Sequence, residues 1–151
     1  MCLQSHCRWR NTGLIMLECL ILGDSLAVGV GQVRSECVTV AKTGINSYDY
    51  VNRHVSRKRD NTSAKTVIIS LGSNDTAKIN TFKELDTLRQ LVDADRVYWI
   101  VPNIKEDKRL AVLTVADKYK DFVIDARKHA VSPDQVHPTY KGYKTISEKT
   151  K

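Results

Sequence analysis

Apolar residues gather in five short runs along the chain, separated by segments in which apolar and polar residues recur at helical spacing. The short runs are rich in aliphatic side chains, and most end at glycine, proline or a polar turn, as buried strands do. Run 17–22 is apolar apart from Glu18, which is typical of a strand covered on both faces of a parallel sheet. The predicted strands are residues 17–22, 37–41, 66–71, 96–101 and 121–125.

The segments between these runs predict helices. Ser47 is the predicted N-cap of the second helix, with Tyr48, Val51 and Val55 on its buried face. Thr81 is the predicted N-cap of the third helix. The predicted helices are residues 28–36, 48–58, 81–92, 108–118 and a last one that begins near residue 139.

Strands that alternate with helices over the whole chain predict βαβ units, and therefore an α/β fold whose parallel sheet has helices on both faces. A chain of 151 residues is long enough for one core and too short for two. We expect residues 1–15 to form a disordered polar leader and residues 16–151 to form the single domain.

The net charge of +7 changes this picture little, because the basic residues are scattered and aromatic residues make up only 7% of the chain. A nucleic-acid site usually concentrates basic residues on one face, so we expect a solvated basic surface and no nucleic-acid partner. No apolar run approaches the ~20 residues of a membrane-spanning helix, and no membrane partner is expected. The run 14–22 contains Glu18 and has no cleavage site after it, which favours a cytoplasmic location over export.

The four cysteines show no Cys-x-x-Cys spacing. Cys19 and Cys37 lie in apolar runs, where we expect them to be free thiols packed in the core. Cys2, His6 and Cys7 have no second pair of ligands to complete a zinc site. We therefore expect neither a metal nor a cofactor.

Residues that could take part in catalysis or ligand binding follow the first three predicted strands. Ser25 comes after the first strand, Gly44 after the second and Asn74 after the third. Ligand and catalytic sites of open α/β sheets form at the carboxyl ends of the strands. We therefore expect these three segments to bring their backbone and side-chain groups together at that edge of the sheet.

A serine hydroxyl becomes a nucleophile only when a base and a group that orients the base lie next to it. Asp134 and His137, three residues apart before the last predicted helix, can supply both for Ser25. The backbone N–H groups of Ser25 and Gly44 and the amide of Asn74 can then donate to the oxyanion of a tetrahedral intermediate.

Four motifs in this order resemble the sequence blocks of the SGNH/GDSL hydrolases. They are Gly-Asp-Ser-Leu at 23–26, the isolated Gly44, Gly-x-Asn-Asp at 72–75 and Asp-x-x-His at 134–137. The resemblance runs from about residue 17 to the C-terminus. It implies a flavodoxin-like, three-layer α/β/α sandwich with a sheet of about five parallel strands, and hydrolysis of carboxylic esters without a metal.

By matching position, the resemblance assigns Ser25 as the nucleophile, His137 as the base and Asp134 as the residue that orients it. Gly44 and Asn74 join the Ser25 backbone in the oxyanion hole. A short chain with little room for a lid suits a small-molecule or carbohydrate ester with a short acyl group, such as acetyl. The alternative is a catalytically inactive protein of this fold that binds an acylated glycan or a protein partner.

Three other interpretations fit the sequence less well. An α/β-hydrolase needs Gly-x-Ser-x-Gly, and Ala27 stands where the second glycine would be. A dinucleotide-binding loop begun by Gly29 and Gly31 lacks its third glycine, which is replaced by Arg34. A flavodoxin-like binding protein without catalysis shares the architecture, but it leaves Asn74 and the Asp134–His137 pair without a role.

Overall fold

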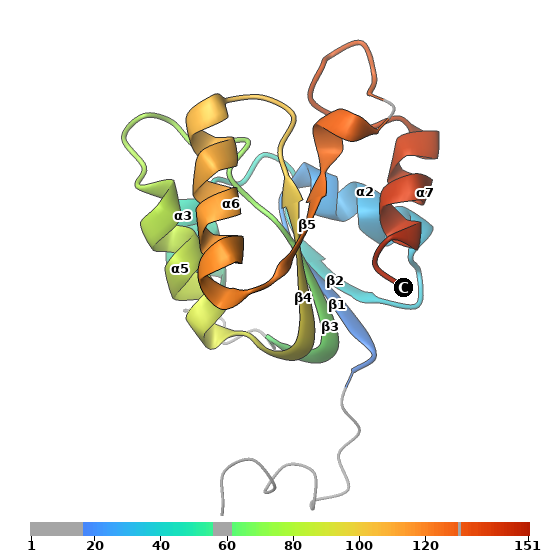
Figure 1. The fold of residues 1–151 in the computed structure, drawn as a ribbon, viewed down its shortest axis with the longest axis horizontal. Coiled ribbons are helices and arrows are strands. Elements are labelled where there is room, and N and C mark those ends of the chain that lie inside the picture. The colour runs from blue at the N-terminus through green and yellow to red at the C-terminus, as the bar shows by residue number, and fades with distance from the viewer. Residues whose placement is uncertain (1–16, 56–61, 130) are drawn as a thin grey trace, which may run out of the picture.

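The computed structural model describes residues 17–55, 62–129 and 131–151. Within them, five parallel strands form one sheet in the order β2-β1-β3-β4-β5, as the flavodoxin-like prediction requires (Figure 1). The predicted leader, residues 1–15, lies outside the described residues. The strands are β1 (Cys19–Gly23), β2 (Val38–Ala41), β3 (Ser63–Ser70), β4 (Asp93–Val101) and β5 (Phe122–Asp125).

Helices cover both faces of the sheet, which confirms the single-domain, three-layer α/β/α architecture (Figure 1). Helices α2 (Ser25–Val33) and α7 (Tyr140–Glu148) lie together on one face. The other face carries α3 (Ser47–Asp49), which continues into the π-helical turn η1 (Tyr50–Val55), and α5 (Thr81–Leu91) and α6 (Glu106–Tyr119). A short 3-10 turn, η2 (Ala126–Lys128), follows β5.

In the central strand β1, successive side chains enter opposite cores, because a strand alternates its side chains between the two faces of the sheet. In β1, Leu20 and Leu22 pack with η1, α5 and α6, whereas Cys19 and Ile21 pack with α2 and α7. All four are buried. The nearly continuous apolar run at 17–22 is thus explained by a strand with a core on each side.

Gly23 ends β1 with a φ of +136°, which side chains disfavour. A Cβ at this position would lie 1.8 Å from the backbone carbonyl oxygen of Ser70 on β3. Only glycine fits, and the chain can therefore turn sharply within contact of β3 and begin α2 at Ser25.

The predicted helix at 48–58 differs from the structure. Its N-cap is Asn46, whose side chain accepts from the backbone N–H of Asp49, and not Ser47. The wider π turns that follow change which residues face inward, so Tyr50 is buried and Tyr48 is 47% exposed, while Val51 and Val55 are buried as predicted. The end of the prediction, residues 56–58, lies outside the described residues. The helix at 81–92 is likewise capped one residue earlier, by Asn80 and not by Thr81.

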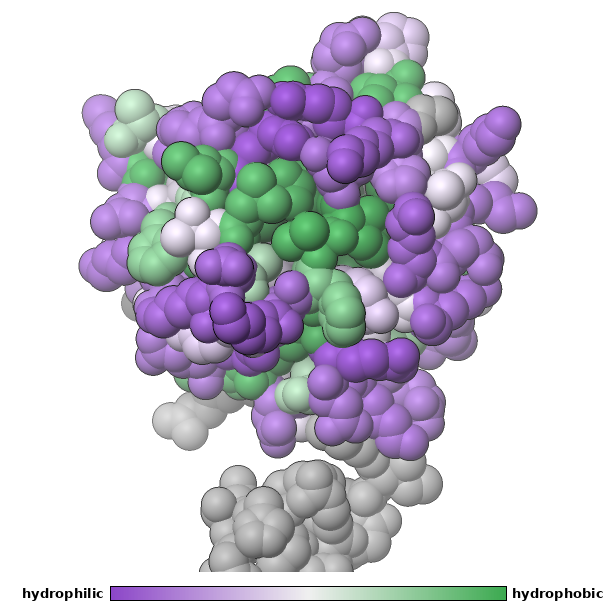
Figure 2. Space-filling view, viewed as in Figure 1, coloured by the Kyte–Doolittle hydropathy of each residue, from purple (hydrophilic) through white to green (hydrophobic). Residues whose placement is uncertain are grey.

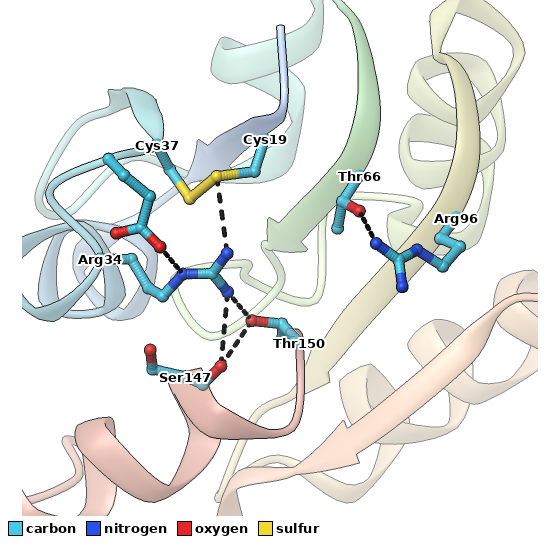
Figure 3. Close-up of a disulfide and its surroundings, with 8 residues drawn as sticks. Cys19, Arg34, Cys37, Thr66, Arg96, Ser147 and Thr150 are labelled. Atoms are coloured by element: carbon cyan, nitrogen blue, oxygen red, sulfur yellow. Dashed lines mark hydrogen bonds and ion pairs between the residues drawn. A yellow bond between two sulfur atoms is a disulfide. The ribbon is translucent and has the colours of Figure 1, made fainter.

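Cys19 and Cys37 form a disulfide, so the prediction of free thiols was wrong (Figure 3). The register pairs Leu20 with Val38, which brings the residue before each into contact, with the two Cα atoms 4.8 Å apart. The sequence shows two apolar runs but not their register, and the register decides whether two cysteines meet.

Arg34 connects this disulfide to the C-terminal end of the chain (Figure 3). Its guanidinium donates to Cys19 Sγ over 3.6 Å, to the carbonyl oxygen of Ser147 over 3.4 Å and to the hydroxyl of Thr150. Its Nε also pairs with Glu36 at 2.7 Å. One buried cation therefore joins the start of β1 to the end of α7.

None of the described helices is long and apolar enough to cross a membrane. Figure 2 shows apolar side chains gathered in the middle of one face, where the edge strand β5 lies in Figure 1. On β5, Phe122 is 53% exposed and Val123 is 46% exposed. Apolar residues of the opposite edge strand also reach the surface, since Val38 of β2 is 45% exposed.

Candidate active site

The carboxyl ends of the strands all lie at one edge of the sheet, at the top of Figure 1, where the loop before α7 joins them. Ser25 is the first residue of α2, directly after the turn that ends β1. Its backbone N–H lies in the first turn of a helix, where no intrahelical acceptor exists. The hydroxyl and the N–H of Ser25 thus both belong to this edge.

Ser25, His137 and Asp134 form a continuous hydrogen-bonded chain. Ser25 Oγ lies 2.7 Å from His137 Nε2, and His137 Nδ1 lies 2.7 Å from Asp134 Oδ2. With the ring proton on Nδ1, the imidazole donates to the carboxylate and accepts from the serine hydroxyl. The imidazole side chain is 39% exposed, so the site is open to solvent.

The loop that carries Asp134 and His137 is held by its own hydrogen bonds. Asp134 Oδ1 accepts from the backbone N–H groups of Val136 and His137 and from the hydroxyl of Ser132, at 2.8–2.9 Å. The backbone N–H of Ser132 in turn donates to the carbonyl oxygen of His137 at 2.8 Å. The hydrogen bond from the His137 side chain, followed by the two backbone donors, holds the pKa of Asp134 well below its usual range. Asp134 is therefore a fixed anion beside the imidazole.

The two other predicted oxyanion donors lie on neighbouring loops. Asn74 follows β3, and its Nδ2 donates to the carbonyl oxygen of Ile45 at 3.0 Å, which uses one of its two N–H bonds. Gly44 follows β2 with a φ of +82°, and a Cβ there would have open space around it. The backbone beside Gly44 and the amide of Asn74 are thus joined through Ile45.

Comparison with known proteins adds evidence on the fold. No protein-family model and no curated protein sequence matches the chain. Several solved structures do match it over most of their length. A GDSL-like lipase from Bacteroides thetaiotaomicron aligns with 95% of this chain and 93% of its own, at 16% identity and a TM-score of 0.59.

A putative acylhydrolase from Bacteroides fragilis aligns with 95% of this chain and 92% of its own, at 16% identity and a TM-score of 0.65. A carbohydrate acetylesterase family member from Sinorhizobium meliloti aligns with 87% of this chain and 94% of its own, at 13% identity and a TM-score of 0.59. The chain has the GDSL hydrolase fold.

On this GDSL hydrolase fold, the structure brings three predicted residues into direct contact, namely Ser25, His137 and Asp134. The Asn74 side chain donates instead to the carbonyl oxygen of Ile45, on the loop that carries Gly44. Their place on the loops after β2 and β3 nevertheless puts them at the same edge of the sheet.

Sequence reasoning missed Asp24, which lies fully buried beneath Ser25 in this fold. Its carboxylate accepts from the hydroxyls of Ser70 and Ser73, each at 2.9 Å, and caps α2 through the N–H of Leu26 at 3.1 Å. Burial raises the pKa of Asp24 to about 6, against the opposing effect of these hydrogen bonds. Asp24 thus anchors the turn before Ser25 to β3. The sequence did carry one indication of this role, because an aspartate directly before a helix is a typical N-cap.

Sequence reasoning also missed Asp75, a second buried carboxylate of the site. It accepts from the backbone N–H of Ser47 at 2.7 Å, from the Ser47 hydroxyl at 2.5 Å and from the hydroxyl of Thr81 at 2.7 Å. Lys105 Nζ donates to the carbonyl oxygens of Ser73 and Asp75 at 2.8 and 3.1 Å. The loop that carries Asn74 is therefore held by the Asp75 carboxylate on one side and by the Lys105 ammonium group on the other.

No group of three or more histidine, cysteine, aspartate or glutamate side chains suited to a metal ion occurs in the described part of the chain. Cys2, His6 and Cys7, for which the sequence analysis predicts no metal site, lie outside that part.

Proposed function

We propose that this chain is a serine hydrolase that cleaves carboxylic esters. The observation that carries the proposal is the unbroken chain from Ser25 Oγ through His137 to Asp134, with 2.7 Å at each link. These distances are those at which a base and its orienting carboxylate act on a nucleophile. The GDSL-like lipase and acylhydrolase that share the fold support the proposal.

In the proposed reaction, His137 Nε2 takes the proton of Ser25 as Oγ attacks the ester carbonyl carbon. The negative oxygen of the tetrahedral intermediate accepts from the N–H groups of Ser25 and Gly44 and from the second N–H of Asn74. His137 then gives the proton to the departing alcohol as the carbon–oxygen bond of the ester breaks. Water, activated by the same imidazole, releases the acid from the acyl-serine.

We further propose that the acyl group is short, such as acetyl, and that the alcohol is a small molecule or a carbohydrate. The exposed imidazole places the reaction at the surface, where a long acyl chain would find little apolar cover. A carbohydrate acetylesterase family member with the same fold supports this substrate class.

The disulfide bears on the compartment in which this reaction takes place. The cytoplasmic location predicted from the sequence stays a prediction, and the Cys19–Cys37 bond argues against it. Disulfides persist mainly in oxidising compartments and are rare in the cytosol.

Labelling with a fluorophosphonate tests the proposed hydrolase, because only an activated serine reacts with the probe. We expect one label on the full chain and on the control variant Ser35→Ala, whose exposed serine lies in the turn after α2. Ser25→Ala should take up no label and should retain the circular dichroism spectrum of the unmodified chain. An unlabelled full chain would favour the alternative, an inactive binding protein of the same fold, and equal labelling of Ser25→Ala would contradict the assigned nucleophile.

A further inference from the structure

A cavity of about 390 Å³ lies beside the candidate active site, beyond the carboxyl end of β2. This volume is within the range of small-molecule pockets. Ser25, Asn74 and His137 do not line it, so it is a neighbouring space and not the reacting centre itself. Its described lining residues are Lys42, Thr43, Gly44, Ile45, Asp49, Arg53 and His54.

Two hydrogen bonds couple this cavity to the catalytic loops. The backbone N–H of Lys42 donates to the carbonyl oxygen of Gly23 at 2.9 Å, two residues before Ser25. Asn74 Nδ2 donates to the carbonyl oxygen of Ile45 at 3.0 Å. Gly44, a proposed oxyanion donor, lines the cavity directly. An ester held with its carbonyl oxygen at Gly44 would therefore place its remaining part next to the cavity.

The lining is polar and basic. Among the described lining residues, Ile45 is the one large apolar side chain, so this part of the cavity is poorly suited to a hydrocarbon chain. The one carboxylate among them, Asp49, is already engaged by Arg53 at 3.4 Å and by Asn46 Nδ2 at 3.2 Å. The side chain of Lys42 makes no hydrogen bond or ion pair with the described residues and is exposed to solvent. The cavity thus carries a net positive charge on Lys42, next to a charge-compensated Arg53–Asp49 pair.

We propose that this cavity binds the alcohol part of the ester and selects an anionic sugar, a hexuronate whose carboxylate pairs with Lys42. The inference rests on the proposed hydrolase function and names its substrate class. A short acyl group has no charge of its own, so the anion belongs to the alcohol. A carboxylate pairs with a lysine through charge-assisted hydrogen bonds, and a positive site attracts an anionic substrate from solution.

A matched pair of esters tests this selection. O-acetylated galacturonate oligomers carry the anion, and the same oligomers with their carboxyl groups converted to methyl esters do not. With acetate release measured, so that cleavage of the added methyl esters does not count, we expect the unmodified chain to show the higher kcat/KM on the acidic oligomers, through a lower KM. The preference should shrink as salt screens the charge.

Substitution of Lys42 then tests whether this residue causes the preference for acidic oligomers. Lys42→Gln is expected to lower the ratio of the two kcat/KM values about fivefold, the scale of one charge-assisted contact at a solvent-open site. Lys65→Gln is the matched control, because it removes the same charge from β3 at the other end of the sheet, where Lys65 pairs with Glu18 at 3.1 Å. An equal loss in both variants, or a preference for the neutral oligomers, would overturn the proposal.

Binding to Ser25→Ala separates this inference from the hydrolase proposal. We expect D-galacturonate, but not D-galactose, to shift the backbone amide resonances of Thr43 and Gly44 in this variant, and Lys42→Gln to abolish the shifts. Such binding without any ester hydrolysis by the unmodified chain would contradict the hydrolase and keep the anion site. Hydrolysis of 4-nitrophenyl acetate with no galacturonate-dependent shift would keep the hydrolase and overturn the anion site.

Discussion

Asp75 holds both the backbone N–H and the hydroxyl of Ser47, at 2.7 and 2.5 Å, and so ties the loop after β3 to the start of α3. Asn74 precedes Asp75, and Gly44 lies three residues before Ser47. The two side loops of the proposed oxyanion hole are therefore set relative to one another by one buried carboxylate. Asp75 is a positioning residue, since it touches neither the nucleophile nor the base.

Asp75→Ala is expected to lower kcat at least tenfold and to destabilise the fold by about 3 kcal/mol, because it leaves the buried N–H of Ser47 without its acceptor. Asp75→Asn keeps one acceptor oxygen and should restore part of kcat. Steady-state kinetics on 4-nitrophenyl acetate and urea unfolding measure the two effects. A kcat that is equally low in both variants would contradict a positioning role that depends on the Ser47 N–H.

Asn74→Ala removes the proposed side-chain donor to the oxyanion. We expect kcat to fall by roughly a hundred- to a thousandfold and KM to change far less, since the hydrogen bond strengthens only as the oxygen becomes charged. Kinetics over a range of ester concentrations separates the two constants. A raised KM with an unchanged kcat would make Asn74 a residue that binds the ground state.

Asp134→Asn tests the residue that orients the base. An amide NH₂ in place of Oδ2 would face the Nδ1–H of His137, so the imidazole would lose its acceptor and its favoured tautomer. We expect kcat to fall on the order of ten-thousandfold, as in other serine hydrolase triads. The circular dichroism spectrum should stay unchanged, and a kcat within tenfold of the unmodified chain would remove Asp134 from the mechanism.

Asp24 makes the stability of the protein depend on pH. Its pKa is raised to about 6, so between pH 4 and 6 the folded chain binds more protons than the unfolded chain, and stability falls as pH rises through this range. A shift from 3.8 to about 6 corresponds to a loss of about 3 kcal/mol. Asp24→Asn has no such titration, so the difference in unfolding free energy between the two proteins should change over this window. A difference that stays constant from pH 4 to 7 would contradict the buried titration.

Reduction of the Cys19–Cys37 disulfide should lower the unfolding free energy by about 3 kcal/mol, given the short loop that it closes. Urea unfolding with and without a thiol reductant measures this loss. The double variant Cys19→Ala, Cys37→Ala is the control, because its stability should not respond to the reductant. An unchanged midpoint on reduction of the unmodified chain would contradict a stabilising disulfide.

The sheet could be predicted from the sequence because its strands are covered on both faces, and such strands are apolar nearly throughout. The N-caps of the helices at 47 and 81 each lie one residue earlier than predicted, and both shifts have the same cause. Ser47 and Thr81, the predicted caps, both give their hydroxyls to Asp75, and the asparagine before each of them caps its helix instead. Local sequence offers a cap at either position, and the buried carboxylate between them decides the choice.

The parts of the candidate site that could be predicted are contacts between residues close together in the sequence. The Asp134–His137 contact spans three residues and follows from their spacing. The disulfide and the Asp24–Ser70 contact each depend on the register of neighbouring strands, which the pattern of apolar residues does not specify. The basic cavity could not be predicted either, because Lys42 and Arg53 both line it only through the path that the chain takes after β2.

In the proposed hydrolase the nucleophile is synthesised well before its base, because Ser25 and His137 are 112 residues apart. Ser25 would therefore stay inactive on the ribosome until the loop that carries His137 has emerged, and a chain cut short after β5 would contain the five described strands but not the base. The base enters on a terminal segment that rests on α2, where the ring of Tyr143 meets Gly29. If the proposed hydrolase is correct, a chain that ends at residue 130 and a separate peptide of residues 131–151 should each be inactive, and ester hydrolysis should return when the two are mixed.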